Sequence, residues 1–235
     1  MSLTLFGFGP DGWGSLLIGG TATTLAATFC GLILSSVIGA IGANAKITGG
    51  HLARVTTEAY TTALRGVPEL LVIFLFYFGS SSVLATIAQL TQHQGFLALP
   101  GFVAGVLAIS VVEGAQMVEV FRGAFSAVRP GEIEAAKACG MNKLLRFRRI
   151  VAPLTMRHAL PGIGNVWIGL LKGSSLLSAT GVAELMRQTE VAAGSTRLPF
   201  DFYICAAAIY IAITLASSLA FQFAEAHYSR GVVRI

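Results

Sequence analysis

Charged residues are scarce in this chain. Asp, Glu, Lys and Arg make up only 11% of its 235 residues, whereas hydrophobic residues make up 54%. Because soluble domains carry about 25% charged residues, this composition argues against a soluble domain and indicates a polytopic membrane protein. Cysteine is also rare, and Cys30, Cys139 and Cys205 show no metal-binding or redox spacing. We therefore predict no metal site and no disulfide, with the three thiols serving as small hydrophobic side chains.

Sequence motifs for chemistry are missing as well. No G-x-x-x-x-G-K-[ST] pattern occurs, so this chain is expected to bind neither ATP nor another cofactor. The apolar segments contain no Ser/His or His/Glu constellation of the kind that an intramembrane enzyme needs, and only His158 lies near the edge of one. We predict no catalytic residue. The first residues, MSLTLFGFGPDGWG, have no basic segment and therefore do not predict a cleaved signal.

Long apolar runs dominate what is present. A membrane-spanning helix needs roughly 20 mostly apolar residues, and helices satisfy their backbone hydrogen bonds internally. The sequence predicts an all-α transmembrane bundle that forms a single domain over residues 1–235. Polar linkers are expected around Lys46, His51 and Arg54, at residues 89–95 and at residues 184–199. The five predicted spans are residues 12–45, about 68–88, 101 to about 125, about 160–182, and 202–224.

The basic residues are distributed unequally between the two sides of this bundle. With five spans, all but three of the 16 Lys and Arg residues fall on one side. Arg187 and Arg197 fall on the other side, and Lys172 lies within a span. The positive-inside rule then places the C-terminus in the cytoplasm and the N-terminus outside. The net charge of +5 is thus explained by topology and anionic lipid, and no nucleic-acid partner is expected.

One polar insert interrupts the apolar sequence. It reads EAAKACGMNKLLRFRRIVAP, residues 134–153, and belongs to a predicted cytoplasmic loop of about residues 127–158. Its apolar positions repeat with helical spacing after the turn signal RPGE, which predicts a short amphipathic helix. Pro153 is expected to end or kink it. Periodicity alone leaves two interpretations open, a basic helix resting on lipid headgroups and a helix that docks on a partner. The predicted apolar stripe is Ile133, Ala136, Gly140, Leu144 and Phe147.

The spacing within the insert resembles the EAA loop of ABC importer permeases. The matching residues are Glu134, Ala135, Ala136, Gly140, Ile150 and Pro153, and the one departure is Ala152, where the family usually has Leu. Further stretches, including RGVPELL (65–71), EVFRGAF (119–125) and LLKGSSLLSATGVAEL (170–185), resemble the polar amino-acid branch of that family. Within the branch, the sequence looks most like the basic amino-acid and opine permeases.

The resemblance implies a type I ABC importer permease of the bacterial inner membrane. In this family the EAA loop is the coupling helix, which inserts into a groove of a cytoplasmic ATPase subunit. The expected partners are an ABC ATPase dimer that binds ATP and Mg, a second permease subunit that is a paralogue or a second copy, and a periplasmic substrate-binding protein. The expected substrate is a polar, cationic amino acid such as arginine, lysine, histidine or ornithine, or an opine.

Glu113, Glu119 and Lys172 are the charged residues of interest inside the predicted spans. Such residues usually face water or protein and mark function. Glu119 and Arg122 lie three residues apart and are predicted to form a structural pair. Lys172 matches a K-x-[ST]-[ST]-L position of the family. It is expected either to pair with a carboxylate or to cap carbonyls at a helix break near residues 173–175, and its role stays open between structure and gating.

Glu113 is the third such residue and lies near the middle of its span. Gln116 follows three residues later on the same helical face, so both are candidates for the substrate path together with Lys172. A carboxylate here would attract a cationic substrate, whereas the competing interpretation is a pair between Glu113 and Lys172. The alternative function is an ion-coupled secondary transporter that uses Glu113, but no internal repeat with paired broken helices is evident.

The linker at residues 184–199 carries charges of both signs. On the predicted topology it is the only mixed-charge loop on the outer side. We expect it to help seat the substrate receptor by electrostatic steering. The residues concerned are Glu184, Arg187, Glu190 and Arg197.

Overall fold

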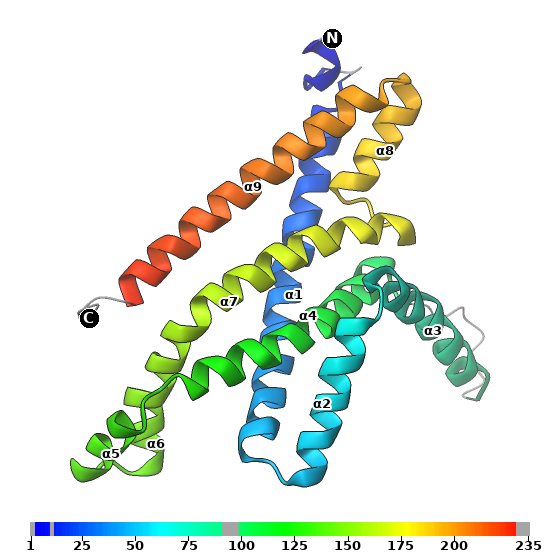
Figure 1. Cartoon of the computed structure of the whole chain (residues 1–235). Helices are drawn as coiled ribbons and strands as arrows, with labels where there is room; N and C mark the ends of the chain where they lie inside the picture. The colour runs from blue at the N-terminus through cyan, green and yellow to red at the C-terminus, as the bar shows by residue number, and fades with distance from the viewer. Residues whose placement is uncertain (1–2, 10–11, 91–98, 229–235) are drawn as a thin grey trace.

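The computed structural model describes residues 3–9, 12–90 and 99–228. Within these ranges every regular element is a helix (Figure 1). The elements are η1 (Leu3–Phe6), α1 (Gly14–Thr48), α2 (His51–Gly66), α3 (Glu69–Leu90), α4 (Gly101–Ser126), α5 (Pro130–Ala138), α6 (Lys143–Arg146), η2 (Phe147–Val151), α7 (Ala152–Gly173), η3 (Ser174–Thr180), α8 (Leu185–Thr196) and α9 (Pro199–Tyr228). The prediction of an all-α bundle is therefore confirmed.

Three helices are long and apolar enough to cross a membrane on their own. They are α1 with 35 residues, α4 with 26 and α9 with 30. Two further spans arise if each of two bent helix pairs crosses once: α2 with α3, which meet at 107°, and the helical run from Lys143 to Thr180 with α8, which meet at 52°. The described residues thus contain three to five spans, a range that includes the five predicted.

The core forms where α1, α4 and α7 cross. Small residues let α1 and α4 approach closely, because a β-carbon at Gly39 would overlap the side chain of Met117. The same holds at Gly114, where a β-carbon would lie 2.8 Å from the Ile38 side chain. Fully buried side chains fill the space around this crossing, including Ile73, Ile109, Met117, Leu170 and Leu177.

Two predicted linkers are helices instead. α1 continues through Lys46 to Thr48, and α2 begins at His51 after a two-glycine turn, so residues 46–54 do not form a loop. Residues 185–196 form α8 rather than a polar loop. α2 and α8 are amphipathic, and each is too short and polar to be identified as a membrane span on its own. The predicted break at residues 89–95 lies mostly outside the described residues.

The fourth predicted span begins and ends earlier in the sequence than expected. α7 ends at Gly173, and residues 174–180 continue as the 3-10 helix η3 before Gly181 turns with φ 81°. A helix break near residues 173–175 is part of one of the two alternatives predicted for Lys172, and the α-helix does end there.

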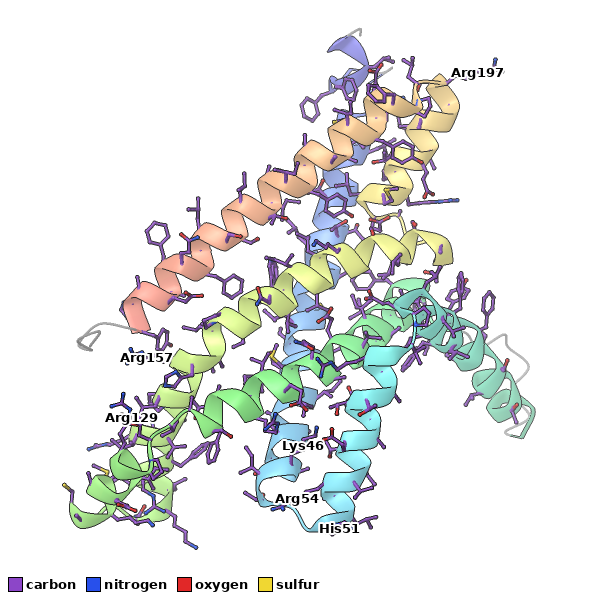
Figure 2. The ribbon with its side chains drawn as sticks, viewed as in Figure 1. Lys46, His51, Arg54, Arg129, Arg157 and Arg197 are labelled. Carbon is purple, nitrogen blue, oxygen red and sulfur yellow. The ribbon has the colours of Figure 1, made fainter. Side chains whose placement is uncertain are left out.

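Basic side chains gather toward one end of the molecule. In Figure 2, Lys46, His51, Arg54, Arg129 and Arg157 lie in the lower part of the view, whereas Arg197 lies at the opposite end. The separation deduced from the order of the spans is therefore also a separation in space. Arg230 and Arg234, which were counted with the basic side, lie outside the described residues.

Candidate functional site

The polar insert begins with α5, which has strong start signals. Pro130 occupies its first turn, where a missing backbone N–H costs nothing. The Glu132 side chain accepts a hydrogen bond from the Arg129 backbone N–H at 3.2 Å. This contact satisfies a backbone group at the start of the helix.

α5 ends after only nine residues, at a left-handed turn. Gly140 has φ 74°, a conformation that favours glycine. Its N–H donates to the Lys137 carbonyl at 2.9 Å, and the Met141 N–H donates to the Ala136 carbonyl at 3.1 Å. This pair of bonds is the Schellman ending of a helix. The predicted single amphipathic helix is therefore wrong: the insert is a helix, a turn and a second helix.

The second helix continues without a break into the long helix α7. Asn142 caps α6 by accepting from the Leu145 N–H at 2.8 Å. α6 is followed directly by the π turn η2 and then by α7. Pro153 is predicted to end or kink the segment, and the structure contradicts only the first alternative, because the helix continues through it. Pro153 removes a backbone donor, and the wider π turn immediately before it lets the helix continue past that position.

The EAA residues do not all face the same way. Glu134, Ala135, Gly140 and Pro153 are exposed, and Ile150 is half-buried. Ala136 is only 4% exposed and packs within its own chain. Exposed members are thus available to a partner, whereas the buried Ala136 is not. Gly140 has no atom within 4 Å of an added β-carbon, so its backbone conformation explains the glycine within this chain.

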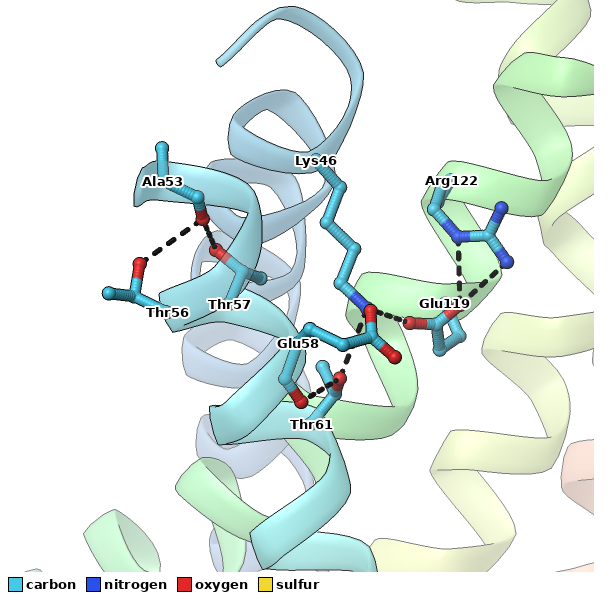
Figure 3. A network of polar contacts seen from close by, with 8 residues as sticks. All are labelled: Lys46, Ala53, Thr56, Thr57, Glu58, Thr61, Glu119 and Arg122. Carbon is cyan, nitrogen blue, oxygen red and sulfur yellow. Dashed lines mark hydrogen bonds and ion pairs between the residues drawn. The ribbon is translucent and has the colours of Figure 1, made fainter. Parts of the chain in front are cut away.

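A network of charges ties three helices together beside this insert (Figure 3). The Lys46 Nζ atom of α1 lies 2.5 Å from Glu58 Oε2 of α2 and 2.6 Å from Glu119 Oε1 of α4. It also donates to the Thr61 hydroxyl at 3.1 Å. Arg122 completes the network through two 2.8 Å contacts with Glu119 Oε2.

Sequence reasoning identified only half of this network. Glu119 and Arg122 were paired because they are three residues apart. Lys46 was missed because it is 73 residues from Glu119, and Glu58 because α2 was not recognised as a helix. The only signal was a single lysine at the end of a long uncharged run. A cavity of about 490 Å³ joins the network to the insert, since Lys46 and Arg122 line it together with Glu134 and Lys137 of α5.

The candidate path residues are brought together only in part. A β-carbon at Gly169 of α7 would overlap the Glu113 carboxyl group, so Glu113 lies directly against that helix. Glu69, which sequence reasoning missed, lies against Gly173, one turn farther along α7. One Glu69 carboxylate oxygen is buried without a hydrogen-bond partner among the described residues. Two carboxylates from α3 and α4 therefore face one glycine-lined stripe of α7.

Lys172 does not complete this group. Its side chain is exposed, as is Gln116. The ion pairs of the described residues join Lys46 to Glu58, Lys46 to Glu119, Arg122 to Glu119 and Arg187 to Glu190. Within those residues Glu113 and Lys172 do not form an ion pair, and the substrate role of Glu113 stays a prediction.

Glu184 does not belong to an exposed outer surface. Its side chain is fully buried and caps α8, accepting from the Met186 and Arg187 N–H groups at 2.8 and 2.7 Å. The Thr24 and Tyr210 hydroxyls approach it at 3.4 Å. Glu184 therefore joins α1, α8 and α9, and its predicted role in receptor steering is wrong. Arg187 and Glu190 form an exposed pair at 3.5 Å.

The described residues contain no group of three His, Cys, Asp or Glu side chains that could hold a metal ion. Cys30, Cys139 and Cys205 are all free.

Comparison with known proteins gives the family. Residues 35–234 match the family model described as binding-protein-dependent transport system inner membrane component. The chain is 51% identical to the octopine transport system permease protein OccQ of Rhizobium radiobacter, across 98% of this chain and 97% of that protein. It is 38% identical to the histidine/lysine/arginine/ornithine transport system permease protein HisQ of Escherichia coli strain K12, across 95% and 97%. A crystal structure of an amino acid ABC transporter with histidines matches with a TM-score of 0.76 and 30% identity, covering 92% and 95%.

These findings confirm that the chain is a non-catalytic, multi-pass inner-membrane subunit. It works in a complex with an ATPase, which binds the nucleotide, and with a binding protein. The resemblance first noticed in the EAA spacing thus extends over nearly the whole sequence. The protein belongs to the binding-protein-dependent transport system inner membrane components, the permease subunits of ABC importers.

Proposed function

We propose that this permease carries a cationic amino acid or an opine into the cell. The observation that carries the proposal is the 51% identity, over 98% of the chain, with a permease of an octopine transport system. The 38% identity with a permease for histidine, lysine, arginine and ornithine supports the cationic class. The Glu113 and Glu69 carboxylates against α7 supply negative charge within the bundle, where a positively charged substrate would offset their loss of water. Gln116 and Lys172 are exposed and lie apart from this pair of carboxylates, and they stay in the proposed path only as residues predicted from the sequence.

Uptake by the purified complex in vesicles tests this proposal. With the binding protein outside and ATP inside, we expect accumulation of arginine, lysine or an opine, and at least about tenfold less of glutamine at equal concentration, because one lost charged hydrogen bond is worth about 1.5–3 kcal/mol. Uptake without ATP but driven by a proton or sodium gradient would instead support the secondary-transporter alternative.

The proposed assembly contains two permeases on two ATPase subunits. The second permease is a paralogue or another copy, and the whole chain, residues 1–235, is one transmembrane domain. The separation of basic residues supports an outer N-terminus and a cytoplasmic C-terminus. Residues 127–158 form the coupling segment. ATP-driven closure of the ATPases would push this segment and shift the permeases between outward-open and inward-open states, provided that ATP favours one of them.

The docking surface is proposed to be the exposed face of α5 and the Gly140 turn. It includes Glu134, Ala135 and Gly140, with Ile150 and Pro153 farther along and Ala136 as internal support. The Lys46 network borders the same cavity as α5. Movement of α5 would therefore displace the network that joins α1, α2 and α4. The Glu119–Arg122 pair is proposed to stabilise that junction.

The native Cys139 offers one test of both docking and orientation. It is exposed beside Gly140, so a membrane-impermeant maleimide should label it in inside-out vesicles that contain the permease alone. Addition of the ATPase should protect it at least several-fold. The control is Ser195→Cys in a Cys139→Ser chain, which should be labelled only from the opposite side. Labelling of Cys139 from outside would refute the orientation, and equal labelling with and without the ATPase would refute docking.

A further inference from the structure

An apolar cavity lies between the end of α1 and the start of the α6–α7 run. It measures about 700 Å³ and is not part of the proposed substrate path. Known small-molecule sites measure about 300–1,000 Å³, so it is large enough for a ligand. Its walls come from four parts of the fold, α1, α4, α5 and the helical run through the π turn. The lining includes Phe121, Phe125, Phe147, Val151 and Met156.

Two cations stand at one side of this apolar cavity. Lys143 and Arg146 of α6 line it and are three residues apart, about one helical turn. Neither forms an ion pair within residues 3–9, 12–90 and 99–228. The Thr155 hydroxyl, also in the lining, is buried and has no hydrogen-bond partner among those residues. The cavity thus combines an apolar body with a positive, hydrogen-bonding edge.

The position of the cavity restricts what can fill it. It lies at the ends of α1 and α4, on the side of the molecule where basic side chains gather (Figure 2). On the orientation proposed above, this is the headgroup level of the cytoplasmic leaflet. Basic pockets between membrane helices on that side suit anionic headgroups. A ligand that is apolar at one end and anionic at the other matches both the lining and the depth.

We propose that this cavity binds an anionic phospholipid. An acyl chain occupies the space among Phe121, Phe125 and Phe147, and the headgroup phosphate lies against Lys143 and Arg146. The exposed Leu144 and Phe147 side chains add apolar surface that the acyl chains of neighbouring lipids can contact. The inference rests on the proposed depth of α6 in the membrane and not on which substrate is carried.

Native mass spectrometry of the purified transporter complex tests the site. The delipidated complex is incubated with phosphatidylglycerol or with phosphatidylcholine of the same acyl chains, and the lipids retained per permease are counted. We expect preferential retention of phosphatidylglycerol. Lys143→Gln with Arg146→Gln should lower its apparent affinity about 20- to 30-fold, since each basic residue near an anionic membrane surface contributes about fivefold. The matched control, Arg148→Gln with Arg149→Gln, removes two neighbouring charges that do not line the cavity.

A second variant tests the apolar part of the site. Ala40 is an exposed residue of α1 that lines the cavity, so Ala40→Trp should fill the acyl space and reduce retention of both lipids. If Arg148→Gln with Arg149→Gln lost the preference for phosphatidylglycerol to the same extent, the preference would come from the general positive charge of the surface. That result would overturn the proposal. The proposal would also be overturned if Lys143→Gln with Arg146→Gln no longer bound the ATPase but retained as many lipids as the wild type. The two cations would then bind the ATPase and not a lipid. Failure of Cys139 protection with normal lipid retention would leave the lipid site standing while docking failed.

Discussion

Lys46→Met is expected to destabilise the permease by about 2 kcal/mol. Removing one partner of a buried ion pair costs about 3–5 kcal/mol when the remaining charge stays buried. The loss here should be smaller, because the Glu58 side chain is 68% exposed and Glu119 is 21% exposed, although Lys46 itself is only 7% exposed. The measurement is the midpoint of denaturant-induced unfolding of the purified complex in a fixed detergent.

Two further variants separate the network from a general effect of losing a lysine. Lys137→Met removes an exposed lysine of α5 and should leave the unfolding midpoint near that of the wild type. Glu119→Gln added to Lys46→Met should recover part of the lost stability, because the uncompensated carboxylate disappears. An unchanged midpoint for Lys46→Met, or no recovery in the double variant, would contradict a stabilising role for the network.

The long apolar helices were predictable because each signal lies within one stretch of sequence. The span predicted at residues 101–125 is α4, Gly101–Ser126, and the uncharged run at 12–45 is α1, Gly14–Thr48. Both are identified by length and by the near absence of charge. The amphipathic helices α2 and α8 were not predicted, since they are short and their stabilisation comes from packing against neighbours. The signal that could have revealed them is helical periodicity of the apolar residues within the polar linkers.

Contacts between distant helices were the harder part of the site. Glu119 and Arg122 share one helix, so their pairing follows from spacing alone. The burial of Glu184 depends on the close approach of α1, where a β-carbon at Gly20 would lie 3.0 Å from the Glu184 backbone. Nothing local to residue 184 reports that approach. Glu69 was similarly unremarkable in sequence, because its position beside α7 depends on the 107° bend between α2 and α3.

Glu113→Gln is expected to reduce uptake of a cationic substrate at least about tenfold, at unchanged assembly and basal ATP hydrolysis. The variant keeps the shape of the side chain and removes its charge. A hydrogen bond to a charged group contributes about 1.5–3 kcal/mol, which corresponds to more than a tenfold change in binding. The measurement is initial uptake of the substrate in reconstituted vesicles, normalised to assembled complex. Glu225→Gln is the matched control, because that carboxylate lies near the end of α9 and is in none of the ion pairs of the described residues.

The structure also sharpens the outcome of a double variant. If Glu113 served only to balance Lys172, then Lys172→Met would restore the yield and transport lost by Glu113→Gln. The two residues are not among the ion pairs of the described chain, and Glu113 instead lies against Gly169 with Glu69 one turn away on the α7 surface. We therefore expect no rescue by Lys172→Met, and a comparable loss of uptake for Glu69→Gln. Full normalised uptake by Glu113→Gln would remove Glu113 from the substrate path. Loss in Glu113→Gln alone, with Glu69→Gln normal, would confine the substrate contact to α4.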